Sequence, residues 1–193
     1  LGVGLARALG GQAGAGSGGW ARPAVPPRMA WLSGSCSDAT RRQVAAANAN
    51  CTGLRLDPMA LAADPGLASR IAADAVARIG DVPVLVYATA APAEVAAAQA
   101  ALGAARAATV VEDAFRGIAG ALAAAGVGAF VVAGGETAGA VVEALGVRAL
   151  AIGPEIAPGV PWTRALGERP LWLALKSGNF GGDDFFARAS ATL

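Results

Sequence analysis

Apolar runs that suit β-strands alternate with stretches of helical spacing along most of this 193-residue chain. Strands are predicted at Met29–Leu32, Thr52–Leu56, Val82–Ala88, Ala129–Ala133, Val147–Ile152 and Leu171–Leu175. Helices are predicted at Asp38–Asn48, Leu67–Ile79, Pro92–Leu102, Ala105–Ala125, Thr137–Leu145 and Asp183–Ala189. This alternation is typical of α/β proteins with a mostly parallel sheet. We therefore expect a three-layer sandwich, with helices on both faces of the sheet.

The start of the chain has a different character. Leu1, Leu5 and Leu9 are spaced as on one helix face, and a glycine-rich stretch and a proline-rich stretch follow. We interpret residues 1–28 as the tail of a preceding domain plus a linker. Residues 29–193 are then one domain, because this length is ample for one core and short for two.

Three turns at strand-to-helix junctions carry most of the functional information. They read SGSCS at 33–37, AGGET at 133–137 and KSGNFGG at 176–182. The first N–H groups of a helix lack intrahelical partners and lie at the positive end of its dipole, so such junctions bind anions, above all phosphates. Because parallel strands end at one edge of a sheet, we predict that the turns meet there and form a nucleotide site.

The GGET turn has two interpretations. Gly134 and Gly135 would let the backbone approach phosphates, while Thr137 would donate its hydroxyl and Glu136 would place a carboxylate near the same edge. In the alternative, the turn is simply tight and Thr137 caps the following helix. The spacing matches neither a P-loop nor GxGxxG, and the missing GxGxxG argues against a dehydrogenase.

Alternatives also remain for the other two turns. Lys176 either meets a phosphate or carboxylate, or extends its ammonium group into water. The glycines around Gly178 and Asn179 favour backbone approach to a ligand, although a plain loop has a similar composition. Ser33 and Ser35 either bond phosphate or ribose oxygens or cap the next helix.

Tryptophan 162 follows a segment, Gly153–Gly159, that contains two prolines and is predicted to be a loop. Trp162 itself is predicted in a loop before the last strand, within GVPWT at 159–163, where it either stacks on a nucleobase or seals the loop by packing. A lone tryptophan more often has the packing role.

Composition excludes several chemistries. Histidine is absent, which rules out histidine metal sites and Ser-His-Asp triads and leaves Cys36 without an activating base. Asp183 and Asp184 would suit a magnesium ion that bridges phosphates, but such a pair more often charges a helix start. We therefore assign no protein ligand for a metal and no catalytic residue.

Charge and hydropathy exclude some partners. A net charge of +1 without a basic stripe argues against nucleic acid. The apolar runs fall short of the roughly 20 residues that span a bilayer. Two cysteines are too few for a disulfide framework, which favours the cytoplasm.

Four segments in this order resemble a known family. They are SGSCS at 33–37, VVAGGETAGAVVEALGV at 131–147, IGPEIAPGVPW at 152–162 and LALKSGNFGGDDFF at 173–186. Together they are similar to the C-terminal nucleotide-binding domain of the four-carbon acid sugar kinases, which include 3-oxo-tetronate, threonate and erythronate kinases.

The resemblance implies a two-domain enzyme in which an N-terminal domain binds the sugar acid and the C-terminal domain binds ATP with Mg²⁺. By similarity, ATP would contact Ser33 or Ser35, residues 134–137 and Gly178. The residues that bind the sugar acid would lie in the N-terminal domain, so this chain alone is expected to bind ATP or ADP without turnover. A phosphate-binding or regulatory module without catalysis remains the alternative, because the same turns would serve it.

Overall fold

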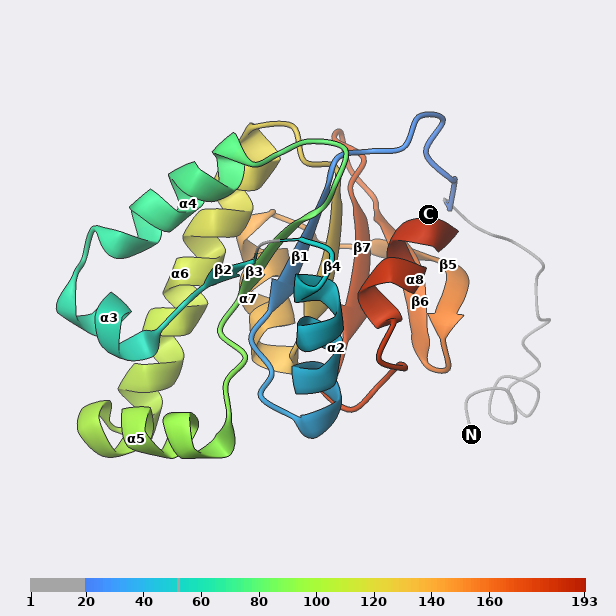
Figure 1. The fold of residues 1–193 in the computed structure, drawn as a ribbon. Coiled ribbons are helices and arrows are strands. Elements are labelled where there is room, and N and C mark those ends of the chain that lie inside the picture. Colours follow the sequence, from blue (N-terminus) through green and yellow to red (C-terminus); the bar gives the residue numbers. More distant parts are fainter. Residues whose placement is uncertain (1–19, 52) are drawn as a thin grey trace, which may run out of the picture.

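The computed structural model of the protein describes residues 20–51 and 53–193. Within these residues, seven strands form one sheet in the order β2-β3-β1-β4-β7-β6-β5 (Figure 1). The helical segment and the glycine-rich stretch predicted at the start of the chain lie outside the described residues, apart from the end of the linker.

The strands are β1 (Met29–Ser33), β2 (Leu54–Arg55), β3 (Val84–Tyr87), β4 (Ala129–Ala133), β5 (Leu150–Ala157), β6 (Val160–Ala165) and β7 (Trp172–Lys176). Strands β2, β3, β1, β4 and β7 are parallel to one another. Strands β6 and β5 continue the sheet in antiparallel pairs. The expected mostly parallel sheet is confirmed.

The helices are α2 (Asp38–Asn48), α3 (Pro58–Ala63), α4 (Leu67–Ala77), α5 (Pro92–Leu102), α6 (Ala104–Ala124), α7 (Gly135–Ala144) and α8 (Phe185–Thr192). Helices α2 and α8 cover one face of the sheet, and α3, α4, α6 and α7 cover the other (Figure 1). Helix α5 packs against α6 at the end where α6 begins. The three-layer arrangement is confirmed.

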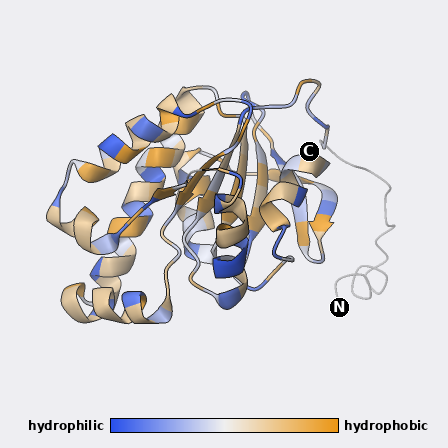
Figure 2. Cartoon of the chain, viewed as in Figure 1, coloured by the Kyte–Doolittle hydropathy of each residue, from blue (hydrophilic) through white to orange (hydrophobic). Residues whose placement is uncertain are grey.

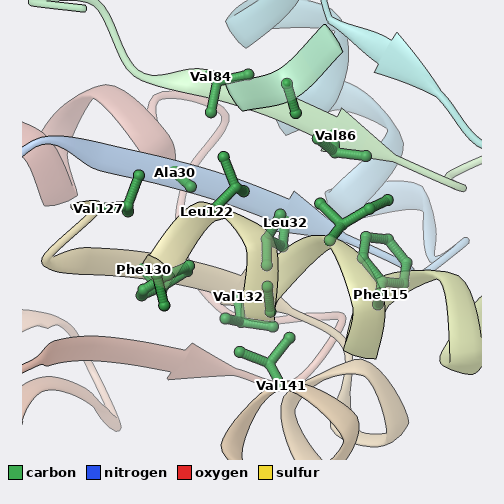
Figure 3. Close-up of a cluster of buried hydrophobic side chains, with 14 of the residues drawn as sticks. Ala30, Leu32, Val84, Val86, Phe115, Leu122, Val127, Phe130, Val132 and Val141 are labelled. Carbon is green, nitrogen blue, oxygen red and sulfur yellow. The ribbon is translucent and has the colours of Figure 1, made fainter. Parts of the chain in front are cut away.

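Alternate residues of each central strand enter two separate cores. Leu32 of β1 and Val132 of β4 lie with Phe115 of α6 in the core under α6 and α7 (Figure 3). Trp31 faces the other way, toward Phe186 of α8, with the two ring centroids 5.4 Å apart. Because both faces of the strands are buried, the sequence of these strands is apolar throughout. In Figure 2 the sheet is accordingly mostly hydrophobic, and hydrophilic residues gather on helices and loops.

The antiparallel part of the sheet differs from the sequence prediction. Most of the segment predicted as a loop at 153–159 belongs to β5, and Trp162 lies in β6 rather than in a loop. Trp162 is fully buried, and its indole N–H donates to the Ala189 carbonyl at 3.2 Å. The packing interpretation of Trp162 is thus confirmed. The prolines obscured β5 in the sequence, but an edge strand tolerates proline because its outer N–H groups need no ladder partner.

Helix α3 was not predicted, because Asp57-Pro58 was interpreted only as a turn. In the structure the Asp57 carboxylate accepts a hydrogen bond from the Ala60 N–H at 2.9 Å, which caps the helix. Pro58 occupies the first turn, where its missing N–H has no cost. The same two residues therefore end β2 and begin a helix.

The connections diverge between β1 and β4. The chain leaves β1 for α2 on one face of the sheet and leaves the adjacent β4 for α7 on the other. Neighbouring parallel strands whose helices depart to opposite faces leave a crevice beyond their carboxyl ends, where α/β proteins bind ligands. The turns after β1 and β4 flank this crevice.

Candidate functional site

The three turns are joined directly to one another. The N–H groups of Gly34 and Ser35 donate to the carbonyl of Ala133, at the end of β4, at 3.0 and 3.2 Å. The Gly134 N–H donates to the carbonyl of Lys176, at the end of β7, at 2.9 Å. The predicted convergence of the turns at one edge of the sheet is confirmed.

The turns line one pocket of about 610 Å³. Of the residues predicted from sequence, Ser35, residues 134–137 and Gly178 line it. The size suits a small organic ligand. The first turn of α7 supplies N–H groups at the positive end of a helix, so the pocket has an anion-binding side.

Glycine is required where the turns come close. Gly134 has φ of +121°, a conformation that residues with a side chain rarely adopt. A β-carbon on Gly178 would lie 2.9 Å from the Ser37 hydroxyl oxygen. Glycine at these positions thus permits the turns to touch.

Three predicted site residues do not line the pocket: Ser33, Lys176 and Asn179. Ser33 is fully buried, and its hydroxyl lies 2.8 Å from that of Thr89. Asn179 is exposed and is not part of the pocket lining. The structure therefore does not support Ser33, Lys176 or Asn179 as residues that contact a ligand in the pocket.

Lys176 is buried, with 2% of its surface exposed. Its ammonium group donates to the Thr40 hydroxyl at 3.1 Å and to the carbonyls of Ser177 and Gly178 at 3.1 and 3.0 Å. Burial lowers the pKa of Lys176 from its usual value to about 8, because desolvation penalises the charged form. The partners are therefore hydroxyl and carbonyl oxygens, rather than the phosphate, carboxylate or water considered from the sequence.

The opposite wall of the pocket was missed in the sequence. It consists of one face of α5 and the start of α6, with small side chains such as Ala98, Ala104 and Ala107, and of residues 55–59 after β2. Alanines carry no chemical signal, so only the three-dimensional arrangement reveals them as a wall. This wall is mostly apolar, in contrast to the turns.

An ion pair stands on this wall. The guanidinium of Arg55 donates to the carboxylate of Glu94, and this hydrogen bond holds the pKa of Glu94 below its usual range. Glu94 also accepts a hydrogen bond from the Ala91 N–H at 3.0 Å at the start of α5. The pair connects β2 to α5 and so fixes the outer wall relative to the sheet.

Residues 30–186 match the family of nucleotide-binding C-terminal domains. The chain belongs to this family. It is 54% identical over 168 residues to a 3-oxo-tetronate kinase of Cupriavidus necator, covering 86% of this chain and 38% of that protein. It is 50% identical over 194 residues to a 3-oxo-tetronate kinase of Methylobacterium radiotolerans, covering 98% of this chain and 46% of that protein. The chain thus spans less than half the length of these relatives.

A crystal structure of a Haemophilus influenzae protein superposes on this nucleotide-binding domain with a TM-score of 0.82 at 36% identity. The superposition covers 96% of this chain and 44% of that one. In the described part of the domain, no helix is both long and apolar enough to cross a bilayer.

Carboxylates near the pocket of the nucleotide-binding domain are dispersed. In residues 20–51 and 53–193, no three acidic, cysteine or histidine side chains are arranged to hold a metal ion. Asp183 pairs with Arg42 at 2.9 Å, and Asp184 stands at the start of α8. Glu136 is exposed and lines the pocket in the first turn of α7. This set fits Mg²⁺ only if phosphate oxygens and water supply most ligands, which is the usual arrangement for that ion.

Proposed function

We propose that this chain is the ATP-binding domain of a kinase that phosphorylates a four-carbon acid sugar of the 3-oxo-tetronate type. One observation carries the proposal: the turns after β1, β4 and β7 line a single pocket with the first helical turn of α7. The names of the similar proteins supply the substrate class. Threonate or erythronate would fit the same chemistry.

Within this proposal, the polar side of the pocket binds the phosphates and the apolar wall receives the base. The N–H groups at the start of α7, such as that of Gly135, would hold phosphate oxygens, and Thr137 lines the same pocket. Phosphoryl transfer depends mainly on such positioning and on charge neutralisation. Magnesium, when bound, would neutralise phosphate charge, and Glu136 provides a carboxylate within the GGET turn itself.

The sugar acid would bind to an N-terminal domain, and residues 1–28 would be the tail of that domain and a linker. The acidic group that accepts the proton of the substrate hydroxyl would belong to that domain. We also propose the cytoplasm as the location, since Cys36 and Cys51 are both free thiols.

Calorimetric titration of the chain with MgATP, ADP, NAD and adenosine tests the nucleotide part. We expect ATP and ADP to bind more tightly than adenosine, and NAD not to bind. A coupled kinase assay then compares the chain alone with the chain joined to its upstream domain. Turnover of a four-carbon sugar acid only by the joined protein supports the kinase. Binding without turnover in the joined protein would favour the phosphate-binding or regulatory module instead.

A further inference from the structure

A buried polar network lies behind residues 177–182, which we call the glycine loop. On helix α2 and its cap, Ser37, Thr40 and Gln43 are three residues apart and so share one side of the helix. All three side chains donate hydrogen bonds to carbonyl oxygens of the glycine loop. Thr40 and Gln43 are fully buried, so this contact is internal to the protein.

The carbonyl of Gly178 is the centre of the network. It accepts from the Ser37 hydroxyl at 2.7 Å, from the Thr40 hydroxyl at 2.8 Å and from the Lys176 ammonium group at 3.0 Å. Lys176 also donates to Thr40 at 3.1 Å, so charge polarises the hydroxyl that holds the carbonyl. Three donors on one carbonyl fix its direction firmly.

Gln43 holds the second half of the glycine loop. Its Nε2 group donates to the carbonyls of Phe180, Gly181 and Gly182 at 3.0, 3.1 and 2.9 Å. Its Oε1 atom is buried without a hydrogen-bond partner in the described structure. A buried unpaired oxygen is costly, so the contact with the loop carbonyls must compensate for it.

Side chains of α2 and its cap therefore hold four carbonyls of the glycine loop, those of Gly178, Phe180, Gly181 and Gly182. Gly178 lines the pocket, and its N–H has no acceptor among the described residues. With its carbonyl held on the α2 side, the Gly178 N–H is the group that this loop can present to an anion in the pocket. Lys176, in contrast, does not line the pocket.

We propose that Thr40, Gln43 and Lys176 are positioning residues for the nucleotide phosphates: they hold the glycine loop by its carbonyls, and Lys176 acts through Thr40 and the loop without touching the nucleotide. This inference rests on the proposed nucleotide-binding function. It assigns the lysine an indirect role that differs from the direct phosphate contact expected from the sequence.

A double-mutant cycle in the intact protein tests the inference, with calorimetric affinities for MgATP and for adenosine as the two readouts. Thr40→Val removes the hydroxyl at nearly constant shape, and Lys176→Met removes the ammonium group. We expect each change to weaken MgATP binding about tenfold, the size of one hydrogen bond of this kind. Adenosine affinity stays unchanged, and the double variant is little weaker than either single one because the two residues act as a unit.

Conservative and matched variants complete the design. Thr40→Ser keeps the hydroxyl and retains MgATP affinity. Thr109→Val removes a hydroxyl that bonds only the Ala105 carbonyl on α6, and leaves both affinities unchanged. Gln43→Met, which preserves Lys176, also weakens MgATP selectively and provides a second reading if Lys176→Met fails to fold.

Distinct results overturn distinct claims. Additive losses in the double variant show that Lys176 and Thr40 act independently, which overturns the claim that Lys176 acts through Thr40. Equal losses for MgATP and adenosine reduce the network to a structural role. A wild-type protein that binds MgATP no better than adenosine overturns the proposed function itself, whereas a selective wild type with unaffected variants overturns only the positioning role.

Discussion

A β-carbon on Gly34 would overlap the hydroxyl oxygen of Thr137, because the turn after β1 lies directly against the first turn of α7. The same β-carbon would lie 3.2 Å from the Phe115 ring of α6. Two segments that are 103 positions apart in sequence, at residues 34 and 137, thus meet without space for one methyl group. Both residues line the pocket.

Gly34→Ala is expected to lower the free energy of unfolding by about 1–3 kcal/mol, the usual cost of overpacking a tight site. Urea denaturation measures the change. Gly117→Ala on α6 is the matched control, since its β-carbon meets nothing within 4 Å and alanine favours a helix. An equally stable Gly34→Ala protein would show that the turns separate easily.

Gly135→Val tests backbone approach to the ligand. Gly135 lines the pocket, and a β-carbon there meets no protein atom within 4 Å, so the valine side chain would occupy the space proposed for phosphate without straining the fold. We expect at least about a tenfold loss of ATP affinity, equivalent to about 1.4 kcal/mol.

Gly139→Val in the same helix also has open space and does not line the pocket, so its affinity and circular dichroism should match wild type. Unchanged ATP binding by Gly135→Val would make the GGET turn purely structural.

The two cysteines provide an internal comparison. Cys36 lines the pocket, whereas Cys51 lies elsewhere and donates to the Ala47 carbonyl at 3.3 Å. Burial raises the pKa of Cys51, which slows its alkylation. Bound MgATP should reduce iodoacetamide labelling of Cys36 and leave that of Cys51 unchanged, as measured by peptide mass spectrometry. Equal protection of both thiols would indicate a conformational change of the whole domain rather than a nucleotide bound in the pocket.

Lys176 should impose a characteristic pH dependence on stability. The pKa of Lys176 is about 8 in the folded protein, compared with 10.5 for a solvated lysine such as that of an unfolded chain. Between these two pH values the unfolded chain therefore keeps a proton that the folded protein has lost. The contribution of Lys176 to the free energy of unfolding therefore rises as the pH increases from about 8 to 10.5. The rise is on the order of 3 kcal/mol at most, from about 1.4 kcal/mol per pKa unit.

Denaturation of wild type and Lys176→Met across this pH range measures the effect as a difference in slope. The comparison removes contributions from other titrating groups, including the exposed Arg42–Asp183 pair. Parallel pH profiles for the two proteins would mean that Lys176 is solvated.

The turns were predictable because their chemistry is local. Gly134 and Gly178 stand beside strand ends, and parallel topology brings such ends to one edge. The direction of the Lys176 side chain was not predictable, because its partner Thr40 is remote in sequence. Likewise, nothing in the sequence distinguishes Ala107, which lines the pocket, from alanines that merely fill helices.

Strand β5 was mispredicted because local sequence signals were misleading. Pro154 and Pro158 indicate a loop when only adjacent residues are considered, but Ile156 and Ala157 are buried against α8 and its neighbours. Tertiary burial therefore overrides local propensity at this edge. The sequence also concealed β6 because its partners, β5 and β7, are needed to recognise it.

Both edge strands of the sheet are poor templates for pairing with a strand of another chain. On one side β2 contributes only Leu54 and Arg55, and on the other β5 is interrupted by register shifts between Ile152 and Ala157. Short, kinked and proline-containing borders cannot guide a foreign strand into regular pairing. A chain so rich in apolar residues is thereby protected from growing into larger sheets at high concentration.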